Sequence, residues 1–429
     1  MPSFRALNQI AGPVILANLA TPLLGFVDVA VIGQLGEAHL LGGLALATMV
    51  FSFLFWGFGF LRMGTTALVA NAVGAENVVS ARQILVRVLS LAAVIGTLMW
   101  LIQRPLSHVI WQLTDGSALV ETTAETYFAV RIWGAPLNLL FIGISGFLLG
   151  MGRARAVLAL QLLLNFANIV LDVLFVLVWH RGVSGVAEAT VWAEGLGVFF
   201  GLYLVRRELL DLTFIEAHRA LINADAWREL LRVNRDIMLR TLCLIFAFAW
   251  FTNQGAIFGD QVLAANLVLM QFIAFAAFFI DGYANAAEVI IGRARGALDP
   301  SRVRAVVATS LRAGWVTGLI MSLLYLPIIP ALLPLIAKDT LVVQQASEFV
   351  LWAAITPLLS SSAYLLDGLF IGALASKAMR NAMIQSLALF LLSWWVLQPL
   401  ANHGLWAAMT LFYLARALTL WRARSALFL

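Results

Sequence analysis

The sequence predicts an all-helical membrane protein of about twelve transmembrane helices, arranged in two pseudo-symmetric six-helix lobes around a central cleft. Hydrophobic residues make up 62% of its 429 residues, and only 11% are charged. The mean hydropathy is +0.95. No soluble fold of this length needs so much apolar surface. The apolar residues form runs of about 20, the length with which a helix crosses the hydrocarbon of a bilayer.

These runs are helices rather than barrel strands, because barrel strands alternate in polarity and need only about 9–11 residues. The first run is interrupted by Asn18 and Asp28 and is too long for a cleaved signal peptide, so we expect it to remain as a span. We expect spans centred near Asn18, Phe55, Ala93, Leu139, Asn168, Leu196, Ala247, Ala277, Leu319, Ala363, Leu389 and Met409.

Positive charges predict the orientation of the spans, because cytoplasmic connections retain Lys and Arg. Most of these residues fall at alternate connections or at the termini, whereas the opposite side has only Arg104, Arg181 and Lys338. Both termini are therefore expected in the cytoplasm. The net charge of +5 follows from this topology, and we expect no nucleic-acid partner.

The longest polar stretch separates the sixth and seventh runs. It divides the chain into an N-terminal six-helix lobe (1–205), a cytoplasmic linker (206–235) and a C-terminal six-helix lobe (236–429). Residues 224–235 are predicted to form a short amphipathic helix at the membrane surface. The linker therefore predicts two structural halves of similar size.

The two halves share motifs at an offset of about 222 residues. Gly146 and Gly150 line up with Gly368 and Gly372. Six spans in each repeat preserve orientation, so we expect a parallel repeat with its axis along the membrane normal. Acids are not duplicated, since Asp172 falls opposite an aromatic residue in the second half, and this asymmetry disfavours a symmetric pore.

Two aspartates, Asp28 and Asp172, lie within apolar runs, where an ionised carboxylate costs about 2.5–3.5 kcal/mol or more. Asn168 precedes Asp172 by one helical turn and shares its face. Tyr127 and Thr190 are candidate polar partners from other spans. Such a cluster can hold a proton shared between acids, or a Na⁺ ion coordinated by oxygens. The alternative is a hydrogen-bonded knot that pins three helices together.

The chain resembles the multidrug and toxic compound extrusion (MATE) transporters, and among them the DinF-like subgroup. The resemblance runs along almost the whole chain, in the order and spacing of five motifs. They are PLLGFVDVAVIGQLG at 22–36, LRMGTT at 61–66, NIVLD at 168–172, NRDIM at 234–238 and LDGLFIG at 366–372.

The resemblance implies a secondary active antiporter that exports amphipathic, often cationic compounds by alternating access, in exchange for H⁺, with Na⁺ as the alternative coupling ion. In DinF-like relatives an acid in span one and an Asn and Asp pair in span five bind the coupling ion, with a Tyr and a Thr nearby. By local match these residues are Asp28, Asn168, Asp172, Tyr127 and Thr190. A Na⁺ ion, if it is the coupling ion, would bind at the first three.

Relatives also bend span one at a proline, and Pro13 is the better positional match for that hinge, with Pro22 as the rival. The resemblance further implies a multi-pass protein of the bacterial or archaeal plasma (inner) membrane. We expect it to act as a monomer on small substrates, without a cofactor.

Three acids of the second half, Asp281, Glu288 and Asp367, are candidates for a substrate cleft that receives cationic compounds. For each, a structural ion pair is an equally good interpretation. Span seven has no acid, unlike the NorM-like subgroup, and this favours proton coupling over a Na⁺ site in the second half.

Two other functions stay open. A flippase of lipid-linked precursors in the same superfamily would need a cationic cleft, whereas the charges predicted at mid-membrane are mostly acidic. A passive channel would carry current without antiport. An enzyme is not expected, because the five His residues are scattered and no phosphate-binding glycine loop precedes a Lys.

Overall fold

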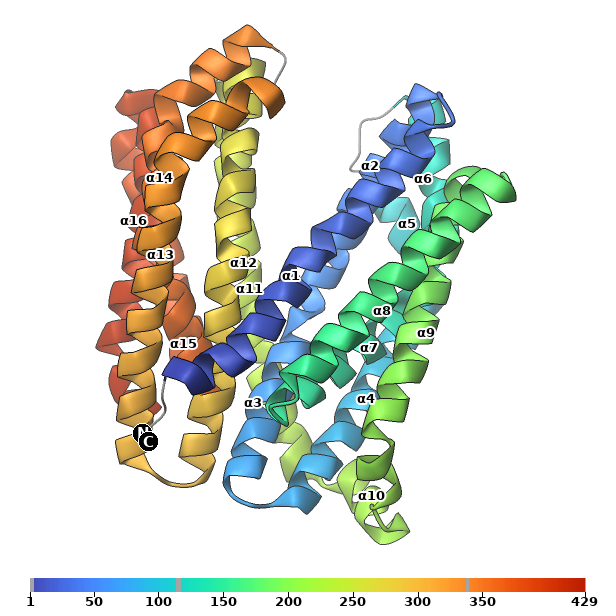
Figure 1. Ribbon diagram of the computed structural model, residues 1–429, viewed down its shortest axis with the longest axis vertical. Coiled ribbons are helices and arrows are strands. Elements are labelled where there is room, and N and C mark those ends of the chain that lie inside the picture. Colours follow the sequence, from blue (N-terminus) through green and yellow to red (C-terminus); the bar gives the residue numbers. More distant parts are fainter. Residues whose placement is uncertain (1–3, 113–116, 337–338, 429) are drawn as a thin grey trace. The chain divides into compact units, whose positions relative to one another are not determined.

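The computed structural model describes residues 4–112, 117–336 and 339–428, and it contains helices but no strand in these ranges (Figure 1). Lys338 lies outside the described residues. The helices are α1 (Phe4–Gly33), α2 (Ala38–Trp56), α3 (Phe60–Gly74), α4 (Val78–Leu101), α5 (Gln103–Trp111), α6 (Ala118–Arg131), α7 (Ala135–Gly150), α8 (Ala154–Asp172), α9 (Gly182–Leu210), α10 (Phe214–Ile222), α11 (Ala224–Ile257), α12 (Asp260–Gly296), α13 (Pro300–Ile336), α14 (Thr340–Gly372), α15 (Ser376–Leu397) and α16 (Ala401–Arg422).

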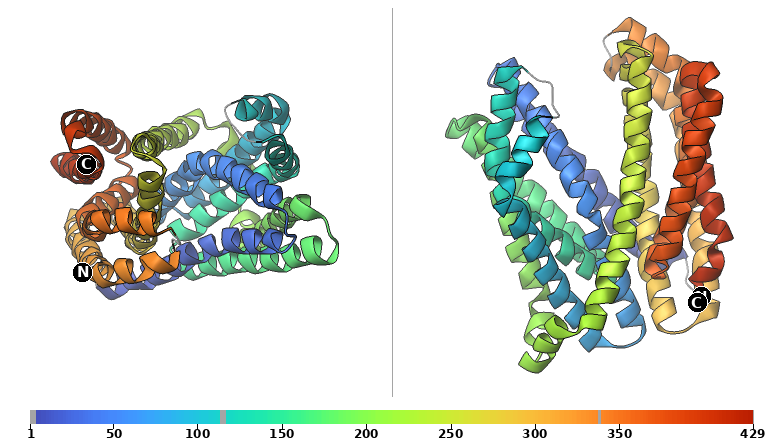
Figure 2. Two further views of the ribbon diagram at one scale, coloured as in Figure 1. Left: turned by 90° about the horizontal axis from the view of Figure 1, so that it is seen from above. Right: turned by 180° about the vertical axis from the view of Figure 1, so that it is seen from behind.

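Eleven segments of the described chain are long and apolar enough to cross a membrane. The last of them, Ser376–Arg422, comprises α15 and α16. A short 3₁₀ turn joins these two helices, which pack side by side (Figure 2). Counted as two crossings, they bring the number to the twelve that the sequence predicts, and every expected span centre lies in one of these segments. The all-helical membrane fold is confirmed.

The polar stretch between the sixth and seventh spans differs from the prediction in one respect. Residues 224–235 do not form a separate surface helix, because they continue without a break into the span α11. The separate short helix is α10, which starts at a capping box between Thr213 and Glu216. It packs on α4, where Arg87 Nε donates to the carbonyl of Ala220 at 2.9 Å.

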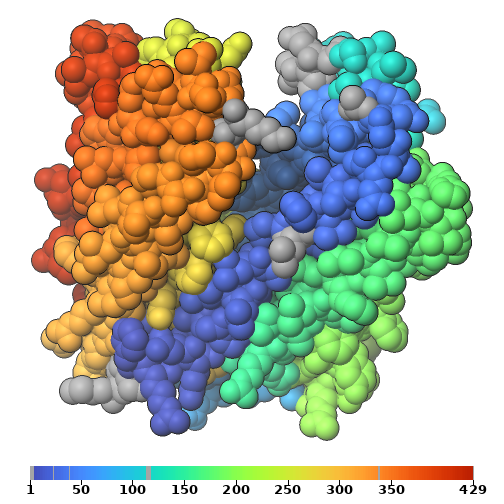
Figure 3. All heavy atoms as spheres, turned by 45° about the horizontal axis from the view of Figure 1, so that its top comes forward, coloured from blue at the N-terminus to red at the C-terminus, as the bar shows by residue number. Residues whose placement is uncertain are grey.

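The chain divides into two compact units. One, the N-unit, comprises Leu16–Val73 and Asn77–Leu231; the other, the C-unit, comprises the chain from Arg232 onward together with the first turns of α1 and Gly74–Glu76. The first turns of α1 lie against helices of the C-unit (Figure 3), where the rings of Phe4 and Tyr283 are 6.4 Å apart.

Close helix contacts repeat between the units at the offset that the sequence predicts. A Cβ atom on Gly150 would lie 2.8 Å from the carbonyl oxygen of Thr66 in α3. Gly372 occupies the same position in the C-unit, where a Cβ atom would overlap the carbonyl oxygen of Glu288 in α12. Glycine is therefore required at both positions, because any side chain would push the two helices apart. These matching contacts preserve the duplication in three dimensions.

Candidate functional site

The two predicted membrane acids meet in the N-unit. Asp28 lies in the second half of α1 and is 7% exposed, and Asp172 ends α8 and is fully buried. Their carboxyl groups lie within hydrogen-bonding reach of each other. Among the described residues, no N–H or O–H group donates to either oxygen of Asp172 or to Oδ1 of Asp28. The two acids thus face each other without the donors that usually satisfy buried carboxylates.

Polar residues along one face of α8 connect this pair to two other helices. Asn165 Nδ2 donates to the carbonyl of Ala20 in α1 at 2.7 Å. One turn further, Asn168 Nδ2 donates to Thr190 Oγ1 in α9 at 3.3 Å. Asn165, Asn168 and Asp172 are three and four residues apart and therefore share one face of α8. The helix α1 lies along α8 (Figures 1 and 3).

Tyr127 completes the predicted set. Its side chain, in α6, is 3% exposed and lies within hydrogen-bonding reach of Thr190 and within electrostatic reach of Asp28. The ring packs edge-on against Phe51, with centroids 6.0 Å apart. The five predicted coupling residues thus come together inside one unit, as an acid pair beside an Asn, Thr and Tyr chain.

A buried ion pair adjoins this cluster. The sequence favours structural pairing or snorkelling for both of its residues, but it does not show that they pair with each other beside the acids. Arg131 donates from both terminal nitrogens to Glu194, at 2.9 and 2.5 Å. Asn138 Nδ2 adds a third hydrogen bond to Glu194 at 2.6 Å. Arg131 also lies within electrostatic reach of Asp28. The signal in the sequence is the spacing of four residues between Tyr127 and Arg131, which puts both on the same face of α6.

The backbone changes its winding immediately after Asp172. Residues Val173–Val178 form a π-helical segment, in which the N–H of Trp179 reaches the carbonyl of Leu174 at 2.9 Å. Such segments are rare and are often found at functional sites. Asp172 therefore lies where α8 departs from regular winding, a feature that hydrophobic periodicity cannot reveal.

Both predicted hinge prolines lie inside α1, which is helical from Phe4 to Gly33. Because proline has no N–H, Pro13 and Pro22 cannot donate the backbone hydrogen bond that other residues of a helix donate. These are the two points at which α1 has one hydrogen bond fewer. A hinge at either proline stays a prediction.

The three acids of the C-unit have different surroundings. Asp367 accepts hydrogen bonds from both Arg240 and Arg416 and is 4% exposed, so the ion-pair interpretation describes it. Glu288 is buried, and Asp281 is half-buried on the same helix. The role of the three acids in substrate binding stays a prediction.

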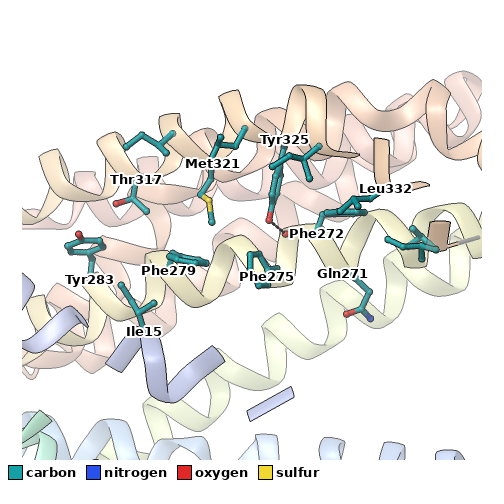
Figure 4. A pocket seen from close by; sticks show the side chains of 15 residues that line it. Ile15, Gln271, Phe272, Phe275, Phe279, Tyr283, Thr317, Met321, Tyr325 and Leu332 are labelled. Atoms are coloured by element: carbon teal, nitrogen blue, oxygen red, sulfur yellow. Dashed lines mark hydrogen bonds between the residues drawn. The ribbon is translucent and has the colours of Figure 1, made fainter. Parts of the chain in front are cut away.

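An apolar pocket of about 700 Å³ lies within the C-unit, between the first turns of α1 and helices α12 and α13 (Figure 4). Five of its lining side chains are aromatic and most of the others are aliphatic, and Tyr325 Oη donates to the carbonyl of Phe272 at 2.5 Å. The volume is in the range of pockets that hold drug-sized molecules. The residues labelled along its wall are Ile15, Gln271, Phe272, Phe275, Phe279, Tyr283, Thr317, Met321, Tyr325 and Leu332.

A duplicated set of six membrane-spanning helices, with a buried acid pair in one half, is the organisation of a membrane transporter. The sequence profile of the MatE family matches residues 13–174 and 237–401. The chain belongs to this family of multidrug and toxic compound extrusion transporters and is not an enzyme.

Known proteins resemble the chain in sequence and in fold. DNA damage-inducible protein F of Escherichia coli (strain K12) is 39% identical over 427 residues, which cover 98% of this chain and 92% of that protein. Human multidrug and toxin extrusion protein 1 is 25% identical over 309 residues, 72% of this chain and 54% of that protein. A crystal structure of MATE in complex with MaL6 matches with a TM-score of 0.88 at 20% identity, over 99% of this chain and 97% of that one. The resemblance drawn from the motifs is confirmed.

Proposed function

We propose that the protein is a secondary active antiporter that exports amphipathic, often cationic compounds in exchange for protons, by alternating access. It acts in the plasma (inner) membrane of a bacterium or archaeon, with both termini in the cytoplasm. The observation that carries the proposal is the pair of buried carboxyl groups of Asp28 and Asp172. They lie within hydrogen-bonding reach of each other, and three of their four oxygens accept from no donor among the described residues.

Two carboxylates within hydrogen-bonding reach repel each other when both are ionised, and a single proton between them removes that repulsion. The pair is therefore a site that holds one proton and responds to its loss. When the proton leaves, two negative charges lie between α1 and α8. Their repulsion is then reduced by a nearby cation or by a rearrangement of α1. A difference in charge between two states is the link that proton-driven transport needs.

The neighbouring residues have distinct roles in this proposal. Hydrogen bonding along Asn168, Thr190 and Tyr127 fixes α8 against α6 and α9. In this proposal α1 is therefore the helix that moves. The Arg131 and Glu194 pair is neutral as a whole, yet its guanidinium is close enough to compensate Asp28 when that acid is ionised. Because α1 lacks one hydrogen bond at each proline, Pro13 or Pro22 is where it would bend.

The substrate class follows from the apolar pocket of the C-unit. Its aromatic and Met side chains suit the apolar part of varied compounds, because such side chains adapt to different shapes. The proton-motive force supplies about 2.3 kcal/mol per charge for each 100 mV, which biases an exchange between two states. Similar solved structures are described as the bent and the straight conformation of MATE, which supports two states for this fold.

The proposal is tested by dye efflux from proteoliposomes under imposed pH and Na⁺ gradients, applied separately. Wild type is expected to respond to the pH gradient, whereas Asp28→Asn and Asp172→Asn are expected to fall to the level of protein-free vesicles. Asp211→Asn is the matched control, because Asp211 is exposed and its ion pair among the described residues is with Arg82 at the surface. Full pH-driven efflux by Asp28→Asn would overturn the proposal, and efflux driven by Na⁺ alone would assign the site to Na⁺.

A further inference from the structure

A second groove of about 850 Å³ lies on the C-unit, between α13, α14 and α16. Its floor is apolar and includes Leu358, Leu366 and Leu418. Among the described residues that line it, the charged one is Arg312, in α13. α13 and α14 run in opposite directions here, since Gly314 packs on Leu365 and Gly318 on Leu358. α16 runs parallel to α14, since Tyr364 stacks on Tyr413 and Asp367 pairs with Arg416. Arg312 therefore lies at the end of the groove where α14 and α16 terminate.

Arg312 differs from the buried arginines of the same unit. Arg240 and Arg416 both pair with Asp367. Arg312 is exposed, and none of the ion pairs in the described part of the chain includes it. An arginine is always ionised, and in a span it needs an anion or water for its charge. Its helix is one of the candidate membrane spans, so the surrounding medium is lipid.

Two tryptophans flank the charged end of the groove. Trp315 is 58% exposed, and its indole donates to Ser362 Oγ at 2.7 Å. Trp421, in the last turn of α16, is 42% exposed, and the guanidinium of Arg424 lies 4.7 Å from its ring. Exposed tryptophans are typical of the level of lipid headgroups. The groove thus has a basic, aromatic end and an apolar length.

The internal repeat shows that the fold itself does not require these residues. In the N-unit the register is set by Gly96, which packs on Pro136 as Gly318 packs on Leu358. At the positions equivalent to Arg312, Trp315 and Trp421 the N-unit has Ser90, Ala93 and Phe199. The charged and indole groups therefore belong to this groove alone, which points to a ligand rather than to packing.

We propose that the groove binds a membrane phospholipid with an anionic headgroup. The phosphate of the lipid pairs with Arg312, and one acyl chain lies along Leu366, Leu418 and Leu358. The lipid comes from the leaflet on the side of the C-terminus, because the charged end of the groove faces the ends of α14 and α16. Bound there, it bridges three helices and stabilises the C-unit.

The test uses the purified full-length protein, stripped of lipid in detergent. Dioleoyl phosphatidylglycerol or dioleoyl phosphatidylcholine is added, and bound lipid is counted by native mass spectrometry while the apparent Tm is measured. Phosphatidylglycerol is expected to raise the Tm more than phosphatidylcholine. Arg312→Gln is expected to weaken its binding roughly 10-fold, the effect of one charge-assisted hydrogen bond.

Two further variants keep the test decisive. Arg304→Gln is the matched control, because Arg304 is exposed on the same helix and does not line the groove. Leu418→Trp fills the groove at a 51% exposed position, so it is expected to exclude the lipid without disturbing the core. Equal effects of the two lipids, equal stabilisation by inorganic phosphate, or unchanged binding in Arg312→Gln would each overturn the proposal.

Discussion

The ion pair between Arg131 and Glu194 allows a sharp prediction about stability. Their side chains are 7% and 3% exposed, and the contact is bidentate. Changing Glu194 to Gln removes the negative charge and leaves the guanidinium buried. Since an arginine in a protein does not lose its proton, it cannot escape the penalty by becoming neutral.

The size of the effect follows from this burial. Breaking a buried pair on one side costs about 3–5 kcal/mol, because an uncompensated charge stays inside. Asn138 does not rescue it, since its amide already donates to Glu194. By contrast, Arg131→Met with Glu194→Leu removes both charges. We expect this double variant to lose less free energy of unfolding than Arg131→Met alone or Glu194→Leu alone, because the effects of the two substitutions are strongly coupled.

The free energy of unfolding can be measured by titrating sodium dodecyl sulfate into mixed micelles while following tryptophan fluorescence. The control is Glu188→Gln on the same helix, whose partner Arg181 is half exposed. That change is expected to cost about 0–1 kcal/mol. If Glu194→Gln costs no more than this control, or if the single effects add in the double variant, the burial argument is wrong.

Three more predictions concern packing, pH and the second buried acid. Gly150→Ala is expected to lower the free energy of unfolding by about 1–3 kcal/mol in the same titration, because the new Cβ meets Thr66; Gly12→Ala, with open space around it, is the control and should not lose stability. The backbone N–H and the hydroxyl of Thr213 donate to Glu216 and hold the pKa of that carboxyl below its usual range. The stabilisation by the Glu216 carboxylate is therefore complete at neutral pH and is lost as the pH falls through the lowered pKa. The Tm of Glu216→Gln should lie below that of wild type at neutral pH and equal it in acid. A difference in Tm that does not change with pH would contradict this argument. Asp367→Asn leaves two buried guanidinium groups underneutralised and is expected to cost about 3–5 kcal/mol, and a loss under about 1 kcal/mol would contradict that assignment.

The sequence predicts the helices and the acid pair well because both depend on local patterns. A run of apolar residues reports a span directly, and a lone aspartate inside it reports a function. Local patterns do not show that Asp28 meets Asp172, since their helices are far apart in the chain. The meeting is expected because buried acids need polar partners, and the family resemblance implies the same pair. The pairing of Arg131 with Glu194 joins α6 to α9, and nothing in either helix alone indicates the partner of the other.

Two features of the helices could not be predicted from the hydrophobic pattern: where α11 begins, and the π-helical segment after Asp172. Residues 224–235 are amphipathic whether they form their own helix or extend α11, because no Gly or Pro in that stretch ends the helix. The π-helical segment after Asp172 consists of apolar residues that would suit a regular helix equally well. Which winding prevails is decided by tertiary packing, not by propensity.

The duplication preserved helix packing while the charges diverged, and this difference bears on where coupling can occur. Glu194 in α9 and Arg416 in α16 occupy equivalent positions of the repeat, with opposite charges. Each is neutralised, but Glu194 by an arginine from α6 and Arg416 by Asp367 from α14. Asp367 of the C-unit is thus held in a structural ion pair. In the N-unit Arg131 pairs with Glu194, and none of the ion pairs in the described part of the chain includes Asp28 or Asp172. For the proposed antiport, this unequal pairing is the reason to expect the coupling site at Asp28 and Asp172 rather than at Asp367.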